Sequence, residues 1–347
     1  MNAPPPDAAD SGRAISVARA FMDVASYDRA AQVVSQALSA HPDDPNLLVE
    51  LARAEIGLRR HQSAAEHVHA ALAVQPRSAY ALMIYAMALD GLHRRGEAIG
   101  VAYQAVLAAP DLPVAHRIYA GLLHDDRHSA QALTVVAEAL RLDPNDADSW
   151  VLRARILQDL RRAAEAETAF AEALRLRPDH ALAVHNRAVN QLRIGKLSRG
   201  STGLVGAARL DPSLGGLARR NLGVVAALGL RRVTLAATVL SVAVIFVVIV
   251  VQAGDPSVVP RVISGVGAAV VAALLIVALR LVPRVSWPSV LRSHPWVVVR
   301  IAHAVCGIGI GAVAAAVGGP EDLLAVGGVL LLFGGVGIRF IGGLAGM

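Results

Sequence analysis

The stretch that decides the fold is residues 142–175, LDPNDADSWVLRARILQDLRRAAEAETAFAEALR. Proline cannot continue the hydrogen-bond ladder of a helix, so Pro144 ends the helix before it and sets a turn. Two helices can then cross closely where side chains are no larger than a methyl group, as at Ala154 and Ala166, while Trp150 and Phe170 fill the space beside the crossing. The stretch therefore predicts two antiparallel helices joined by a short turn.

This unit recurs every 34 residues along the first two thirds of the chain. Six prolines share its phase: Pro42, Pro76, Pro110, Pro144, Pro178 and Pro212. Three series of small residues do so as well: Ala18, Ala52, Ala86, Ala120, Ala154 and Ala188; Ala30, Ala64, Ala98, Ala132, Ala166 and Gly200; and Ala37, Ala71, Ala105, Ala139, Ala173 and Ala207. Self-similarity at a fixed period indicates stacked repeats, so residues 11–214 are predicted to form six of them, after a disordered N-terminus at 1–10.

The pattern resembles the tetratricopeptide repeat (TPR) family, and the resemblance implies an all-α fold, a TPR α-solenoid of six helix-turn-helix repeats. One helix pair cannot bury its apolar face alone, so the pairs stack on one another. The fourth repeat has His124 to His128 where the family usually closes the turn with glycine, and the sixth has Gly200 at a packing position. We expect these two repeats to be the looser ones.

In the TPR family the first helix of each pair lines a concave groove that holds a peptide or a helix of a partner. The resemblance implies that the groove of this chain is lined by a mixture of apolar and cationic partner-binding residues. They are Val49, Arg53, Tyr80, Met83, Met87, Arg117, Val151, Arg155 and His185. Arginine can hold a carboxylate through two parallel hydrogen bonds, so an acidic or C-terminal peptide is the implied ligand class. The alternative is that these arginines are ordinary solvated side chains.

The last third of the chain has the composition of a membrane domain, predicted at 233–347. After a capping helix and linker at 215–232, four uncharged runs are long enough, or nearly so, to cross a hydrocarbon core of about 30 Å. They are 233–253, 262–279, 301–320 and 323–338. The fold class expected for this part is a four-helix transmembrane region, with a buried soluble hairpin as the alternative for the last two runs.

Charge gives the expected orientation. Of the 27 acidic residues only Asp255, Glu321 and Asp322 follow residue 211, where all ten basic residues are arginines. These arginines flank the uncharged runs mainly on one side, with Arg261 as the exception, and cytosolic loops carry such an excess. No signal peptide precedes the repeats, so we expect a multi-pass protein of a bacterial inner (cytoplasmic) membrane, with its TPR domain and C-terminus cytosolic.

The predicted function is that of a non-catalytic membrane-anchored scaffold or adaptor whose partners are a protein or peptide and the lipid bilayer. The basic excess lies in the hydrophobic part, which argues against nucleic acid as a partner. No phosphate-binding loop, nucleophile turn or zinc motif occurs, so no enzyme activity, metal or cofactor is expected. His303 and Cys306 lie on one face of the third run, where a neutral interfacial histidine is the simpler interpretation. A TPR-regulated channel or transport component, and a catalytic subunit that needs residues from a partner, remain as alternatives.

Overall fold

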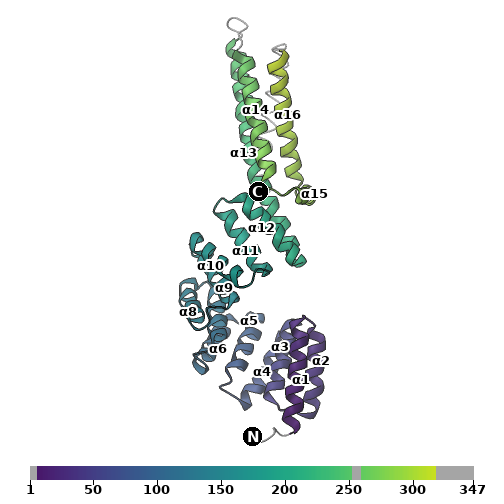
Figure 1. Cartoon of the computed structure of the whole chain (residues 1–347), viewed down its shortest axis with the longest axis vertical. Helices are drawn as coiled ribbons and strands as arrows, with labels where there is room; N and C mark the ends of the chain where they lie inside the picture. The colour runs from purple at the N-terminus through teal and green to yellow at the C-terminus, as the bar shows by residue number, and fades with distance from the viewer. Residues whose placement is uncertain (1–5, 252–258, 318–347) are drawn as a thin grey trace. The chain divides into compact units, whose positions relative to one another are not determined.

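The computed structural model describes residues 6–251 and 259–317, and all regular structure in these residues is helical (Figure 1). The chain divides into two compact units, Met1–Leu176 and Arg177–Met347. Each unit is described by itself. The first contains only paired helices, and the second joins one further pair to the long apolar helices.

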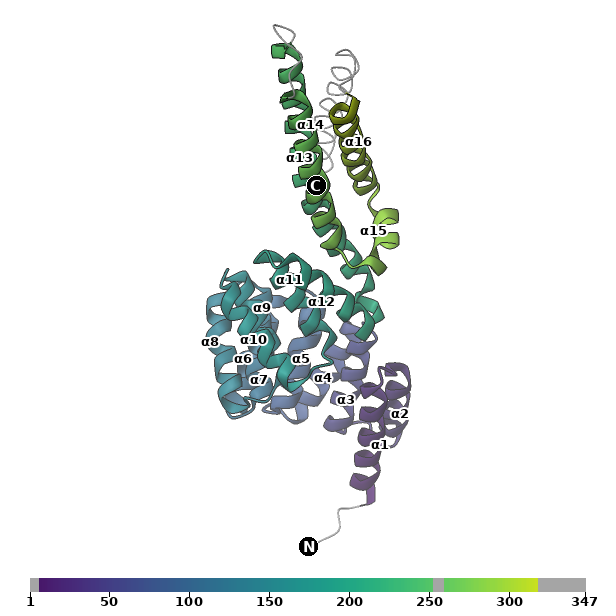
Figure 2. The same ribbon diagram turned by 45° about the horizontal axis from the view of Figure 1, so that its top comes forward.

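The first unit consists of five antiparallel helix pairs, each packed on the next (Figures 1 and 2). Their bounds are α1 (Pro6–Asp23) with α2 (Tyr27–Ala40), α3 (Pro45–Gly57) with α4 (His61–Val74), α5 (Ala79–Gly91) with α6 (Arg95–Ala108), α7 (Pro113–Asp125) with α8 (Ser129–Leu142), and α9 (Ala147–Asp159) with α10 (Ala163–Leu176). Helix α1 begins at Pro6, so it extends into the stretch 1–10 that was expected to be disordered.

The second unit begins with a sixth pair and continues into long helices. Its elements are α11 (Ala181–Arg193), α12 (Leu197–Leu210), the short 3-10 helices η1 (Pro212–Leu214) and η2 (Arg284–Ser286), α13 (Gly215–Val251), α14 (Val259–Arg280), α15 (Trp287–Ser293) and α16 (Pro295–Val317). Helices α13, α14 and α16 pack on one another around a shared apolar core. The expected fourth span at 323–338 lies outside the described residues.

The 34-residue pattern has the structural meaning that the sequence predicted. Each second helix ends two residues before a proline of the series, from Ala40 before Pro42 to Leu210 before Pro212. The alanines of the three series are buried, with the exception of Ala37, which is half-buried. The helices can thus approach closely wherever a repeat presents a methyl group, and the TPR solenoid fold is confirmed.

The turn inside each pair contains a residue in the left-handed conformation, which the sequence does not predict. One residue per turn has a positive φ, again every 34 residues, and only the last of the six is a glycine: Ala25, Arg59, His93, Arg127, Arg161 and Gly195. The following amide then donates to the carbonyl five residues back, as His128 does to Leu123 at 2.8 Å. This is the Schellman end of a helix, which usually has glycine at this position because other residues are strained there.

The sixth pair differs from the expectation that it would be loose. A Cβ at Gly200 would lie 2.4 Å from Cδ2 of Leu192 and 2.8 Å from the carbonyl oxygen of Ala188, and one at Gly203 would lie 2.8 Å from Cβ of Ala188. The two glycines therefore let α12 lie closer to α11 than alanine would allow. The distance between the two helices is therefore shorter at this crossing.

Helix α13 covers the end of the sixth pair. Its first turns pack on α12 and also contact α11, as the first helix of a further repeat would. Ala218, Leu222 and Val225 are buried there with Leu204 of α12. The expected capping segment 215–232 and the start of the first expected span belong to this one uninterrupted helix.

Two described helices are long and apolar enough to cross a membrane, in the windows Pro212–Val239 and Pro295–Val313. A third crossing is possible if Gly265–Arg280 and Arg284–Ser293 count together, although the chain bends by 85° between them. An apolar helical region is thus partly seen at the C-terminal end of the described residues, with apolar windows that differ from the predicted bounds.

The strained turns yield a test of stability. Replacing Arg127, whose φ is +68°, by glycine should relieve the left-handed conformation. We expect a gain of about 0.5–1 kcal/mol, because the relief exceeds the extra entropy of glycine in the unfolded chain. Circular dichroism of the detergent-solubilised chain should show a melting temperature raised by roughly 1–3 °C.

The matched control is Gly195→Ala at the same phase, where φ is +79° and a Cβ would have nothing within 4 Å. This variant should lose stability through backbone strain alone. An unchanged or lower melting temperature for Arg127→Gly would contradict the assignment of strain to these turns.

Candidate functional site

The first helices of successive pairs lie along one side of the first unit. Helix α1 contacts α3, α3 contacts α5, α5 contacts α7, and α7 contacts α9. We call the surface formed by these five helices the inner face. Side chains of neighbouring repeats can meet there although they are about 30 residues apart in the sequence.

Local capping fixes the two helices that carry the centre of the site. The Asp44 carboxylate accepts from the amides of Asn46 at 2.9 Å and Leu47 at 3.5 Å and begins α3, and the Ser78 hydroxyl accepts from the amide of Ala81 at 3.3 Å and begins α5. Such caps supply partners for amides that would otherwise be unsatisfied at a helix start. The cap at Ser78 lies two residues before Tyr80, and the cap at Asp44 fixes the start of the helix that carries Glu50 and Arg53.

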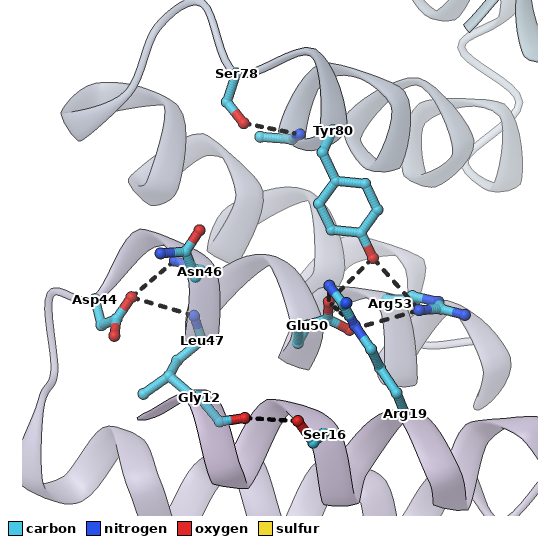
Figure 3. Close-up of polar contacts among 11 residues, drawn as sticks. Gly12, Ser16, Arg19, Asp44, Asn46, Leu47, Glu50, Arg53, Ser78 and Tyr80 are labelled. Atoms are coloured by element: carbon cyan, nitrogen blue, oxygen red, sulfur yellow. Dashed lines mark hydrogen bonds and ion pairs between the residues drawn. The ribbon is translucent and has the colours of Figure 1, made fainter. Parts of the chain in front are cut away.

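Four polar side chains from α1, α3 and α5 converge on the inner face (Figure 3). Glu50 is almost completely buried, with 1% of its surface exposed. Its Oε1 accepts from Arg19, with Nε at 2.8 Å and Nη2 also in contact, and from the Tyr80 hydroxyl at 3.2 Å. Its Oε2 lies 3.6 Å from Nη1 of Arg53, and that same Nη1 lies 3.4 Å from the Tyr80 oxygen. We call these four residues the Glu50 cluster.

The Glu50 cluster carries more positive than negative charge. Two guanidinium groups share one carboxylate, and they remain 51% and 37% exposed at Arg19 and Arg53. The hydrogen bond that Arg19 donates to Glu50 raises the pKa of Arg19. Burial, and then the charge of Glu50, raise the pKa of Tyr80, so its phenol stays protonated and donates. The buried carboxylate thus holds two arginines whose other donors face outward.

The other two groove arginines predicted from the sequence have different surroundings. Arg117 on α7 lies 3.0 Å from the carboxylate of Asp146, the residue that caps α9. Arg155 on α9 lies 3.7 Å from Asp125 at the end of α7. Each of these arginines is matched by one carboxylate of the neighbouring repeat, so the pairs hold α7 and α9 together and leave no surplus charge.

The apolar members of the predicted groove are mostly covered. Met83 is 4% exposed, and Val49 and Val151 are similarly buried, whereas Met87 is 40% exposed. His185 lies on α11 of the second unit, where its side chain is 6% exposed. Of this part of the set, Met87 alone offers substantial surface on the inner face.

Sequence reasoning missed the partners of the predicted arginines. Arg19 shares the 34-residue phase of Arg53 and Arg155, so the repeat itself could have identified it. Glu50 is a lone carboxylate in the apolar run Leu47 to Ala52, which is a signal of a buried ionic contact. Among residues 6–251 and 259–317, no three His, Cys, Asp or Glu side chains gather where they could hold a metal ion.

The Glu50 cluster should contribute to stability in a way that exposed pairs do not. Glu50→Gln removes the only negative charge between two arginines inside the repeat stack. Because the carboxylate is buried and its partners are half exposed, we expect a loss of about 1–3 kcal/mol. Thermal unfolding of the full chain in detergent measures it.

Glu97→Gln is the matched control, since Glu97 pairs with Arg94 at 2.7 Å while both side chains are about half exposed. Exposed pairs contribute little, so the control should leave the melting temperature almost unchanged. Equal effects of the two variants would show that the buried carboxylate has no special role.

His185 should make the second unit sensitive to acid. Burial lowers the pKa of His185, and its Nδ1 has no hydrogen-bond partner. The unfolded chain therefore binds a proton at about pH 6.5 that the folded chain resists, so stability is complete above about pH 6.5 and falls as the pH drops below it. Thermal melts at pH 7.5 and 5.5 should show this loss, and His185→Gln should reduce it. An identical loss in His185→Gln would assign the acid sensitivity to other groups.

Comparison with known proteins gives the same fold. Family models described as tetratricopeptide repeat match residues 22–88 and 122–181. The Cut9–Hcn1 hetero-tetramer of the APC/C is 14% identical with a TM-score of 0.55, over 61% of this chain and 42% of that chain. YrrB, a TPR protein with an unusual peptide-binding site, is 19% identical with a TM-score of 0.39, over 55% of this chain and 99% of that chain.

PilF of Pseudomonas aeruginosa is 18% identical with a TM-score of 0.49, over 60% of this chain and 95% of that chain. No curated protein matches this sequence. The two matched segments, the 34-residue phase and the stacked helix pairs agree with one another. The chain therefore contains tetratricopeptide repeats.

Proposed function

We propose that this protein is a membrane-anchored adaptor whose TPR inner face binds a carboxylate-bearing peptide segment of a protein partner. TPR proteins generally mediate protein–protein interactions, and this is the part of the proposal that family membership supports. The partner chemistry and the membrane anchor are inferences from the residues of this chain. No catalytic step is part of the proposal.

The observation that carries the partner chemistry is the surplus charge of the Glu50 cluster. Arg19 and Arg53 share one buried carboxylate and keep outward-facing donors. A guanidinium group can hold a further carboxylate by two parallel hydrogen bonds, and such charge-assisted bonds are among the stronger ones in proteins. Arg117 and Arg155 each have a carboxylate of their own, so we assign the peptide carboxylate to Arg19 and Arg53.

An apolar anchor lies on the same face. Met87 occupies on α5 the phase that Arg53 occupies on α3, and it is 40% exposed. Its flexible thioether side chain adapts to different apolar partners. A segment with a carboxylate at the Glu50 cluster and an apolar side chain toward α5 fits this combination.

The membrane anchor is supported by the apolar helices of the second unit. Two of them are long enough to cross a membrane. The arginines of α13 to α16 lie mainly at one end of the expected spans, as expected for the cytosolic side of a multi-pass inner-membrane protein. The repeats would then present their inner face in the cytosol.

A peptide-display selection with free C-termini tests the partner chemistry. The full chain in detergent is used as bait, and the affinities of the selected peptides are then measured for a triple variant, Arg19→Gln, Glu50→Gln and Arg53→Gln. This variant removes the whole charge cluster without leaving an unpaired buried carboxylate. Loss of two charge-assisted contacts should weaken binding by more than about tenfold.

The matched control also loses two arginines and one glutamate, through Arg94→Gln, Arg95→Gln and Glu97→Gln at the start of α6, where all three side chains are exposed. It should bind like the wild type. Selected peptides without a preference for carboxylates, or equal affinities for both triple variants, would contradict the proposed site. Amidation of the peptide C-termini separates recognition of a terminal carboxylate from recognition of acidic side chains.

A further inference from the structure

The apolar helices of the second unit carry positive charge without compensation. The ranges 215–251 and 259–317 contain nine arginines and no aspartate, glutamate or lysine: Arg219, Arg220, Arg231, Arg232, Arg261, Arg280, Arg284, Arg292 and Arg300. In the first unit, by contrast, arginines repeatedly pair with carboxylates. A carboxylate that pairs with any of these arginines would have to come from outside their own helices.

One of these arginines is buried. Arg300, in the second turn of α16, is 8% exposed, whereas Arg231 and Arg232 on α13 are exposed. Arg231 lies on α13, which packs on α16, so the two arginines are on neighbouring helices and carry like charge. Among the described residues Arg300 makes no ion pair or side-chain hydrogen bond. A buried charge without a partner is costly, so an anion between these two side chains would remove a penalty and contribute attraction.

Two glycines of α13 bring the surrounding elements together at this level. A Cβ at Gly223 would lie 2.0 Å from Nε2 of His294, at the corner before α16, and one at Gly229 would lie 3.0 Å from Leu281, just after α14. The space that a Cβ of these two glycines would need is thus occupied by residues of the segment that joins α14 to α16. Arg231 lies two residues after Gly229, so it is at the level where this loop packs on α13.

The base of the bundle has the features of a membrane interface. The segment Arg284–Ser293 is turned by 85° from α14, and its Trp287 packs on the core while its indole donates to the carbonyl of Leu279 at 3.2 Å. Tryptophan is enriched at headgroup depth. Beyond this level α14 and α16 expose large aliphatic side chains: Val266, Val270, Ile276, Val277, Val298, Val299, Val305 and Val313.

We propose that Arg231 and Arg300 bind the phosphate of an anionic phospholipid whose acyl chains lie against the aliphatic surface of α14 and α16. An anionic lipid fits better than a zwitterionic one, because its headgroup brings no cation of its own to a site that already holds two guanidinium groups. Guanidinium groups match phosphate oxygens by paired hydrogen bonds. This inference rests on the membrane anchor proposed above.

Lipid retention by the full chain tests the site. The protein is purified in detergent, mixed with equal amounts of phosphatidylglycerol and phosphatidylcholine, and the bound lipids are counted by native mass spectrometry. Wild type should prefer phosphatidylglycerol. Arg231→Gln and Arg300→Gln should each reduce that preference by about fivefold, the equivalent of ~1 kcal/mol per arginine near anionic lipid.

Arg219→Gln is the matched control, because Arg219 lies on the same helix about 18 Å before Arg231. It should keep the wild-type preference. Arg231 is exposed, so its substitution does not disturb the core, and it remains informative if Arg300→Gln fails to fold. Equal retention of both lipids by wild type, or equal loss in Arg219→Gln and Arg231→Gln, would overturn the site.

Two further experiments test the lipid assignment and the membrane anchor separately. Inorganic phosphate in large excess should not displace the lipid, because the acyl chains contribute to binding; displacement would indicate a site for free phosphate and overturn the lipid assignment. Alkaline carbonate extraction of membranes tests the anchor on its own. Release of the protein would overturn the anchor, whereas a retained protein without lipid preference would overturn the arginine site alone.

Discussion

The close crossing of two helices over side chains no larger than a methyl group is the contact on which this chain depends. Ala18, Ala52 and Ala86 are completely buried on three successive first helices, at one position of the 34-residue unit. Interaxial distances of packed helices are about 8–10 Å depending on the side chains at the contact, so methyl groups permit a close approach. Since every unit repeats the same crossing, residues of equal phase have equivalent positions along the stack, and Arg19 and Arg53 come to the same inner face.

The solenoid makes different use of its charges along that face. At α7 and α9, each inward arginine has one carboxylate of the neighbouring repeat, which completes the contact between repeats. At the first three repeats, one buried carboxylate serves two arginines and a tyrosine hydroxyl. Breaking a buried ionic contact costs more than an exposed one, so Glu50 fixes the geometry of the two arginines while their outward donors remain available.

One helix of the second unit, α13, packs on different helices along its length. The beginning of α13 packs on α12 as another repeat would, and its continuation packs on α14 and α16. A helix satisfies its own backbone hydrogen bonds, so it can pass from a protein-packed end to an apolar surrounding without a break. Gly223 and Gly229 mark the level at which the loop between α14 and α16 closes onto α13. Arg231, two residues after Gly229, and Arg280, just before Leu281, lie close to this level.

The sequence by itself determined the period, the helix pairs, the proline-terminated ends and the apolar character of the last third, because these follow from local spacing and composition. It also predicted Arg53, Tyr80, Arg117 and Arg155 as residues of a partner-binding groove. Only the tertiary structure decided which carboxylate each arginine meets, that Met83 and His185 are buried, and that Gly200 tightens its crossing. Those outcomes depend on contacts between residues about 10 to 30 positions apart, which local spacing and composition do not specify. The left-handed turns at Arg59, His93, Arg127 and Arg161 could not be predicted from the sequence either. Packing of both helices imposes there a backbone conformation that residues with a Cβ disfavour.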